Sequence, residues 1–157
     1  MKKRNLGLLL FYIISAEAIG GLSAIITGSY QDFFLVYKEP HLLPPGWLFP
    51  VVWTVLYALM GYSAFKIAET AADRKEKSRA MLIYWLQLLV NFSWSIVFFK
   101  AELLWGGFGV IVLLLVLIIT MSLLFGRINS AAGFLNIPYV IWVAFATYLN
   151  LATAIIN

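Results

Sequence analysis

Cysteine is absent from the 157-residue chain, and histidine occurs only once. Without cysteine there is no disulfide, no thiolate nucleophile and no thiolate metal site. Because His41 is the only histidine, one chain cannot assemble a multi-histidine metal site or a histidine-dependent catalytic triad. His41 falls in a polar connection, where we expect either a solvated side chain or a single haem ligand or hydrogen-bond donor. We therefore predict no metal site and no conventional catalytic constellation.

Charged side chains are also scarce. They make up 11% of the sequence, whereas hydrophobic residues make up 63%. A soluble domain has about 25% charged and about 45–50% apolar residues. So few charges cannot cover a water-facing surface, which excludes a soluble enzyme and a disordered tail. The net charge of +4 does not indicate nucleic acid as a partner, because the basic residues gather at the ends of apolar segments, as they do at membrane surfaces.

Five segments each hold about twenty mostly apolar residues, the length with which a helix crosses about 30 Å of hydrocarbon. They are residues 6–27, 47–68, 80–99, 105–125 and 137–156. The strands of a β-barrel would alternate apolar and polar residues, whereas Val110–Ile119 is continuously apolar. The sequence therefore predicts an all-α integral membrane protein: a single domain over residues 1–157, folded as a five-transmembrane-helix bundle within the lipid bilayer.

The N-terminal segment has some features of a secretory signal. Three basic residues precede a short apolar run, and Ala16-Glu17-Ala18 resembles a cleavage site. The apolar pattern nevertheless continues through Ile25 and Ile26. We therefore expect a retained helix.

Lysine and arginine are distributed unequally between the two ends of these segments. Nine lie on the side of the N-terminus: Lys2, Lys3, Arg4, Lys66, Arg74, Lys75, Lys77, Arg79 and Arg127. Only Lys38 and Lys100 lie on the opposite side. The excess of basic residues on cytoplasmic loops predicts a cytoplasmic N-terminus and an external C-terminus, in a membrane of the bacterial plasma-membrane type.

One carboxylate, Glu17, lies midway along the first segment. An acidic side chain at the bilayer centre costs roughly 2.5–3.5 kcal/mol on insertion scales. Glu17 should therefore face the bundle or water, or be protonated. The sequence leaves two interpretations: a proton or ligand contact, or a neutral acid that hydrogen-bonds to a neighbouring helix.

Small residues recur every four positions along the same segment, at Ala16, Gly20, Ala24 and Gly28. A ridge of this kind lets two helices approach closely. It suits packing within the bundle and equally suits contact with a second copy of the chain. The spacing does not separate these two interpretations.

Aromatic residues amount to 17% of the chain, including six tryptophans. In the second segment Phe49, Trp53 and Tyr57 follow one another at spacings of four, so they share one face of a helix. An aromatic belt at the membrane surface would explain Trp47. Trp53 should lie deeper, which favours the wall of a pocket.

Two further aromatic stripes have helical spacing. They are Asn91, Trp94 and Phe98 in the third segment, and Trp142, Phe145, Ala146 and Leu149 in the fifth. Each stripe alone is compatible with ordinary helix packing, and the amide of Asn91 needs a partner, either another helix or a ligand. Three stripes that each carry a tryptophan at comparable depth favour a shared aromatic cavity between the second, third and fifth segments.

Three motifs carry a resemblance to a known family. They are Pro44-Pro45-Gly46-Trp47 with Trp53 through Gly61, Asn91-Phe92-Ser93-Trp94 with Phe98-Phe99, and Pro138 through Asn150. On these residues the chain resembles the TspO/MBR family, which comprises the bacterial tryptophan-rich sensory proteins and the mitochondrial translocator protein, or peripheral benzodiazepine receptor. The resemblance spans nearly the whole chain. It implies a five-helix bundle, often a homodimer, with a pocket that opens toward the connection between the first two helices.

The resemblance also implies a ligand and its contacts. Members of the family bind porphyrins and synthetic ligands of the benzodiazepine-receptor type. The ligand expected here is protoporphyrin IX or a haem-like tetrapyrrole, or another small hydrophobic molecule, and no cofactor is required. The implied ligand-binding positions are Trp47, Phe49, Pro50, Trp53, Asn91, Trp94, Phe98, Trp105, Trp142, Phe145, Ala146 and Leu149.

Three functions are compatible with such a pocket. The first is a membrane receptor or sensor in which a flat macrocycle stacks on tryptophan and phenylalanine rings. The second is an enzyme that degrades protoporphyrin IX in light, with Trp53 and Trp142 as the catalytic, redox-active rings. The third is a porphyrin or small-molecule transporter, which five helices without an internal repeat do not favour.

Sterol binding has weak support in the sequence. The mitochondrial members of the family carry a cholesterol-recognition pattern that ends in a basic residue after the fifth helix, and here no lysine or arginine follows Tyr148. Leu59, Tyr62 and Lys66 in the second segment satisfy the same short pattern formally, but the pattern is unspecific.

Overall fold

The computed structural model describes residues 3–28 and 30–157, with side chains for residues 5–28 and 32–157. Within that part of the chain no strand is present, and five helices are long and apolar enough to cross a membrane. They are built from α1 (Lys3–Thr27), α3 (Leu48–Glu69), α4 (Arg74–Ser95) continued by the π-helical turn η1 (Ile96–Lys100), α5 (Leu104–Ile128) and α7 (Ile137–Ile156). The prediction of an all-α bundle with five crossings is confirmed. Lys2, which was counted for the orientation, lies outside the described residues.

The third crossing begins earlier than predicted. The carboxylate of Asp73 accepts hydrogen bonds from the backbone N–H groups of Lys75 at 2.9 Å and Glu76 at 3.2 Å, and so caps the N-terminus of α4. Residues 74–79, which precede the predicted segment 80–99, are therefore the first turns of the helix. Hydrophobicity marks where a helix enters the hydrocarbon, whereas the cap marks where the helix begins.

Two connections contain short helices that were not predicted, α2 (Tyr30–Val36) and α6 (Ser130–Phe134). Helix α1 runs without a break through residues 16–18 and ends before Gly28, whose backbone φ is 84° and whose N–H donates to the carbonyl of Ala24 at 3.0 Å. Glycine adopts this left-handed conformation without the strain that a Cβ would cause, so it ends α1 and lets the chain turn toward α2.

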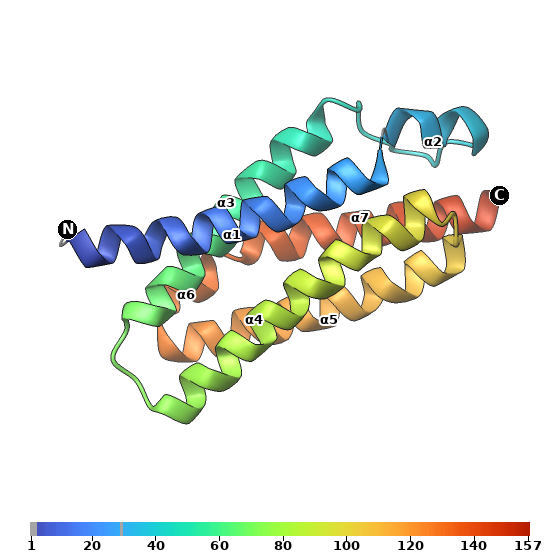
Figure 1. Ribbon diagram of the computed structural model, residues 1–157. Coiled ribbons are helices and arrows are strands. Elements are labelled where there is room, and N and C mark those ends of the chain that lie inside the picture. Colours follow the sequence, from blue (N-terminus) through green and yellow to red (C-terminus); the bar gives the residue numbers. More distant parts are fainter. Residues whose placement is uncertain (1–2, 29) are drawn as a thin grey trace.

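Helix α1 packs along α3 and also contacts α4, while α5 lies between α4 and α7. Figure 1 shows that α2 and the C-terminus lie at one end of the bundle and the N-terminus at the other, as an odd number of crossings requires. The amide of Asn157 links these segments at the α2 end: it accepts from the backbone N–H of Lys38 at 2.8 Å and donates to the backbone carbonyl of Lys38 at 3.2 Å.

The contact between α1 and α3 is made by small residues on both helices. Ala16 is fully buried, and a Cβ on Gly20 would overlap the ring of Tyr57. On the other helix, a Cβ on Gly61 would lie 2.6 Å from the Cα of Ile13. The first half of the small-residue ridge, Ala16 and Gly20, therefore packs within the bundle, whereas Ala24 and Gly28 are exposed. The contact with a second copy of the chain stays a prediction.

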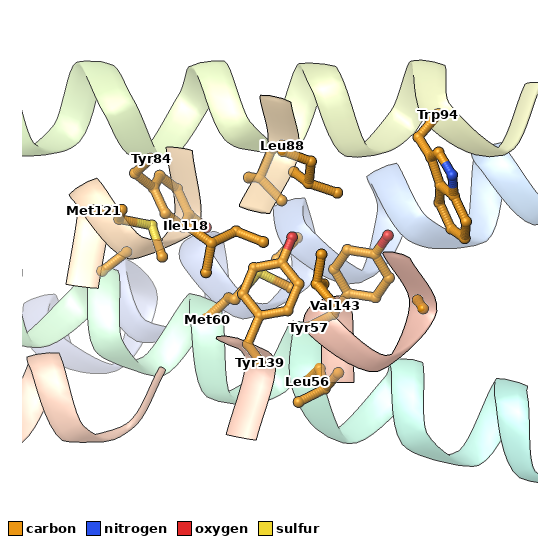
Figure 2. Close-up of a cluster of buried hydrophobic side chains, with 14 of the residues drawn as sticks. Leu56, Tyr57, Met60, Tyr84, Leu88, Trp94, Ile118, Met121, Tyr139 and Val143 are labelled. Carbon is orange, nitrogen blue, oxygen red and sulfur yellow. The ribbon is translucent and has the colours of Figure 1, made fainter. Parts of the chain in front are cut away.

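The centre of the bundle is filled by large aliphatic and aromatic side chains. Met60, Leu88, Ile118, Met121 and Val143 are fully buried there. Figure 2 shows them around the rings of Tyr57 and Tyr139, whose hydroxyl groups are both directed toward α4. This packing fills the centre of the bundle.

Candidate ligand-binding site

A cavity of about 260 Å³ lies between α1, α3 and α4, in the half of the bundle nearer to α2. Its size approaches that of typical ligand pockets, about 300–1,000 Å³. Its walls are mostly apolar, with hydroxyl and amide groups on one side. The lining residues are Gly20, Ser23, Ala24, Thr27 and Gly28 of α1 and its end, Phe49, Pro50, Trp53 and Tyr57 of α3, and Asn91, Trp94, Ser95 and Phe99 of α4 and η1.

The aromatic wall is formed by α3 and α4 together. Phe49, Trp53 and Tyr57 line the cavity from one face of α3, as their spacing predicts. The ring of Trp53 stacks on that of Tyr57 with 5.6 Å between centroids, and it lies 6.0 Å from the ring of Trp94. Two indoles from different helices therefore meet at the cavity, which provides flat apolar surfaces for a planar guest.

The π-helical turn changes which side chains of the third crossing face the cavity. In η1 the backbone N–H of Ala101 donates to the carbonyl of Ile96 at 2.8 Å, so residues five apart lie one above the other. Phe99 is five residues after Trp94, and its ring lies 5.8 Å from the indole. Phe99 therefore lines the cavity beside Trp94, and Phe98 is turned away from it.

Three hydroxyl groups form the polar wall between α1 and α4. Ser23 Oγ donates to the carbonyl of Phe92 at 3.1 Å and is hydrogen-bonded to Ser95 Oγ. Thr27 Oγ1 donates to Ser95 Oγ at 3.1 Å. If Ser95 in turn donates to Ser23, all three protons are used, and the free lone pairs make this wall an acceptor surface.

The floor of the cavity is a buried hydrogen-bond chain across three helices. The hydroxyl of Tyr57 donates to Asn91 Oδ1 at 3.1 Å, and Asn91 Nδ2 donates to the hydroxyl of Tyr139 at 2.7 Å. Tyr139 then donates to Gln87 Oε1 at 2.8 Å. The amide of Asn91 thus has partners on α3 and α7, which satisfies it in the apolar interior. This is the outcome expected if its partner is another helix.

A much narrower cavity of about 20 Å³ lies where η1, α7 and the connection between α1 and α3 meet. That space suits about one water molecule. Ala146 and Leu149 of α7 line it together with Phe98. The residues that line both cavities, and therefore form the partition between them, are Phe49, Trp94 and Phe99.

The structure divides the twelve predicted contacts into three groups. Five line the larger cavity: Phe49, Pro50, Trp53, Asn91 and Trp94. The narrow cavity adds three more: Phe98, Ala146 and Leu149. Four line neither: Trp47, Trp105, Trp142 and Phe145.

The four remaining positions are of two kinds. Trp47 and Trp105 are 66% and 61% exposed, as residues of an interfacial aromatic belt would be. Trp142 packs its ring 5.8 Å from that of Phe49 and 5.9 Å from that of Phe145, so it contacts a residue of the cavity lining without lining the cavity itself. Its Nε1 is buried without a hydrogen-bond partner among the described residues.

Sequence reasoning did not assign α1 to the site. Gly20, Ala24 and Gly28 were considered only as a packing ridge, and Ser23 and Thr27 were not considered at all. In the structure all five line the cavity. The available signal was the pair of hydroxyl residues beside the ridge, since hydroxyls in hydrocarbon need partners.

The connection between α1 and α3 covers the outer end of the site. Phe33 of α2 is buried and lies 5.3 Å from the ring of Phe98 and 5.1 Å from that of Phe99. The hydroxyl of Tyr37 donates to Glu102 at 2.9 Å. This hydrogen bond, followed by desolvation and the negative charge of Glu102, raises the pKa of Tyr37 above its ordinary value.

Glu17 lines neither cavity. Its side chain is partly exposed, one turn before Gly20 on α1. Both interpretations of this carboxylate therefore stand as predictions.

Comparison with known proteins identifies the family. The family model described as the TspO/MBR family matches residues 10–156. The chain is 35% identical over 125 residues to "Tryptophan-rich protein TspO" of Chlorobaculum tepidum, an alignment that covers 80% of this chain and 79% of that protein. It is 33% identical over 154 residues to "Protein CrtK" of Rhodobacter capsulatus, covering 98% and 94%.

Similarity extends to animal proteins. The chain is 30% identical over 131 residues to the "Translocator protein" of Homo sapiens, covering 82% of this chain and 76% of that protein. A match over nearly the whole chain, together with five membrane-spanning helices and a tryptophan-lined cavity, leads to one assignment: the chain is a membrane protein of the TspO/MBR family.

Proposed function

We propose that this protein is a membrane receptor or sensor that binds a planar tetrapyrrole, with protoporphyrin IX as the leading candidate, in the cavity between α1, α3 and α4. The observation that carries the proposal is the convergence of Trp53 and Trp94, from two helices, on one intramembrane cavity. Indole faces stack well on a flat apolar ring. No cofactor is needed for binding of this kind.

The polar groups around the cavity fit the rest of such a ligand. The hydroxyl wall of Ser23, Ser95 and Thr27 offers acceptors within reach of pyrrole N–H groups. Gly28 lies at the end of the cavity nearest to the outer connection. Carboxylates of the ligand would lie toward that end, where water is accessible, because burying them in hydrocarbon is costly.

A tetrapyrrole needs more room than the larger cavity offers. The partition of Phe49, Trp94 and Phe99 separates it from the narrow cavity lined by Ala146 and Leu149. Rotation of the Phe99 ring would join the two spaces. The ligand would then contact α7 as well, and the contacts implied for Ala146 and Leu149 would form on binding.

The test is a titration with protoporphyrin IX, followed through its Soret absorbance in detergent. Trp53→Leu should weaken binding about ten-fold or more, because it removes a stacking ring. Trp105→Leu is the matched control, since it removes an exposed tryptophan outside both cavities. Equal affinities of the two variants would contradict the site.

A light-dependent degradation of the porphyrin is a second candidate function. The observation in its favour is that Trp53 and Trp94 both line the cavity and that Trp53 also lies 6.2 Å from the ring of Tyr139 behind it, so oxidisable indoles would lie beside a bound macrocycle. Trp142 lines neither cavity and is the weaker candidate. Loss of ring absorbance under illumination, faster than for free porphyrin and dependent on Trp53, would support this function.

We also propose a bacterial-type plasma membrane with the N-terminus in the cytoplasm, on the basis of the unequal distribution of lysine and arginine. The α2 end of the cavity would then face outward. A homodimer is proposed from the resemblance alone.

A further inference from the structure

An open apolar groove of about 550 Å³ lies between α3, α6 and the start of α7, at the end of the bundle away from α2. Leu59, Tyr62 and Lys66 line it from α3, and Phe134 and Pro138 line it from the other side. Phe134 is 69% exposed. The groove is separate from both cavities of the candidate site and shares no residue with them.

One charged residue lines this groove among the described residues. Lys66 is the charged residue of the lining, and no carboxylate lines the groove among the described residues. Its Nζ lies 5.6 Å from the centroid of the Tyr62 ring, so the aromatic face holds the ammonium group over the groove. Lys66 is in the last turn of α3, at the depth where a helix leaves the hydrocarbon.

The sequence pattern and the groove coincide. Leu59, Tyr62 and Lys66 have helical spacing of three and four residues, so they share one face of α3. They are the same three residues that formally satisfy the short cholesterol-recognition pattern. On its own that pattern is unspecific, but here its three members are the α3 wall of one groove.

We propose that this groove binds an anionic phospholipid, with an acyl chain along Leu59, Phe134 and Pro138 and the phosphate at Lys66. Charge complementarity selects this occupant, since no carboxylate lines the groove among the described residues and Lys66 lies at headgroup level in the last turn of α3. A sterol would offer the lysine only a neutral hydroxyl. The site is independent of the proposed tetrapyrrole function.

The proposal is tested by native mass spectrometry of delipidated protein in detergent, with equal amounts of dioleoyl phosphatidylglycerol and dioleoyl phosphatidylcholine. Lys66→Gln should lower the ratio of bound phosphatidylglycerol to phosphatidylcholine about five-fold, the effect of one lysine near an anionic lipid. Lys75→Gln is the matched control, an exposed lysine at the same end of the bundle and outside the groove. Its ratio should equal that of the unmodified protein.

A second variant tests the groove itself. Ala131→Phe fills the space beside Phe134 without changing charge, and it should reduce retention of both lipids while preserving their ratio. Equal ratios in Lys66→Gln and Lys75→Gln would overturn the proposal. It would also be wrong if added cholesterol, and not phosphatidylglycerol, were retained in a manner that depends on Ala131. The ratio measurement stands even if Ala131→Phe fails to fold.

Discussion

Trp53 shows how much one side chain can organise in this bundle. Its ring stacks on Tyr57, approaches Trp94 and meets Tyr139 edge to face, so it links α3 to α4 and α7. Its position on a shared face with Phe49 could be predicted from spacing. Its neighbours on other helices could not, because helical periodicity says nothing about which faces meet.

At the residue scale, the contribution of α1 to the site leads to a first prediction. Ala24→Phe should weaken protoporphyrin IX binding about ten-fold or more, because the ring would occupy the cavity and overpacking costs about 1–3 kcal/mol. Ala18→Phe is the control, because Ala18 is exposed on the same helix, as Ala24 is, but lies outside the cavity. Binding is measured by Soret titration. A loss in Ala146→Phe but not in Ala24→Phe would place the ligand on the α7 side instead.

A second prediction concerns the buried hydrogen-bond chain. Asn91→Leu should reduce the free energy of unfolding by about 1–2 kcal/mol, because the hydroxyl of Tyr57 loses its partner in an apolar interior while Tyr139 still donates to Gln87. Reversible unfolding in mixed detergent micelles is the measurement. Tyr57→Phe removes one of the same hydrogen bonds and should cost less. If it costs more, the amide is not the centre of the chain.

At the element scale, the contact between α1 and α3 depends on glycines whose surroundings differ. A Cβ on Gly61 would meet backbone atoms of α1, which have little freedom to move, whereas a Cβ on Gly20 would meet only the ring of Tyr57. The close approach of these two helices fixes which face of α1 looks into the cavity. Small-residue spacing alone predicted a close contact, but not its partner.

This contact leads to the third prediction. Gly61→Ala should reduce the free energy of unfolding by about 1–3 kcal/mol, because the two backbones must separate. Gly21→Ala is the control: no atom lies within 4 Å of its Cβ position, so the change should be neutral or stabilise the protein by up to about 1 kcal/mol. Thermal unfolding followed by circular dichroism compares the two variants. A similar effect in both would mean that α1 and α3 do not touch at Gly61.

For the whole molecule, the absence of cysteine makes orientation directly measurable. Glu39→Cys lies in the connection at the α2 end, and Lys75→Cys lies at the opposite end of the bundle; both positions are exposed. In intact cells a membrane-impermeant thiol reagent should label the cysteine at position 39. It should label the cysteine at position 75 only after the membrane is permeabilised. The cysteine-free parent protein gives the background. The reverse pattern would invert the proposed orientation.

The sequence by itself determined the class of protein and its number of crossings, because long apolar runs with few charges have no other stable environment than a membrane. It also identified Phe49, Trp53 and Trp94 as residues of one aromatic region, since spacing within a helix fixes which side chains share a face. The start of α4 was misplaced because hydropathy does not report the Asp73 cap.

Only the tertiary structure decided where the ligand cavity lies. The cavity opens toward α1, and Trp142 packs against Phe49 instead of lining it. The π-helical turn places Phe99 beside Trp94 in the lining of the larger cavity, whereas Phe98 lines only the narrow one. Each of these outcomes depends on how one helix face packs against another and on a local change of helical register. Such contacts arise from the fit of side chains between helices, so the spacing of residues within a single helix cannot predict them.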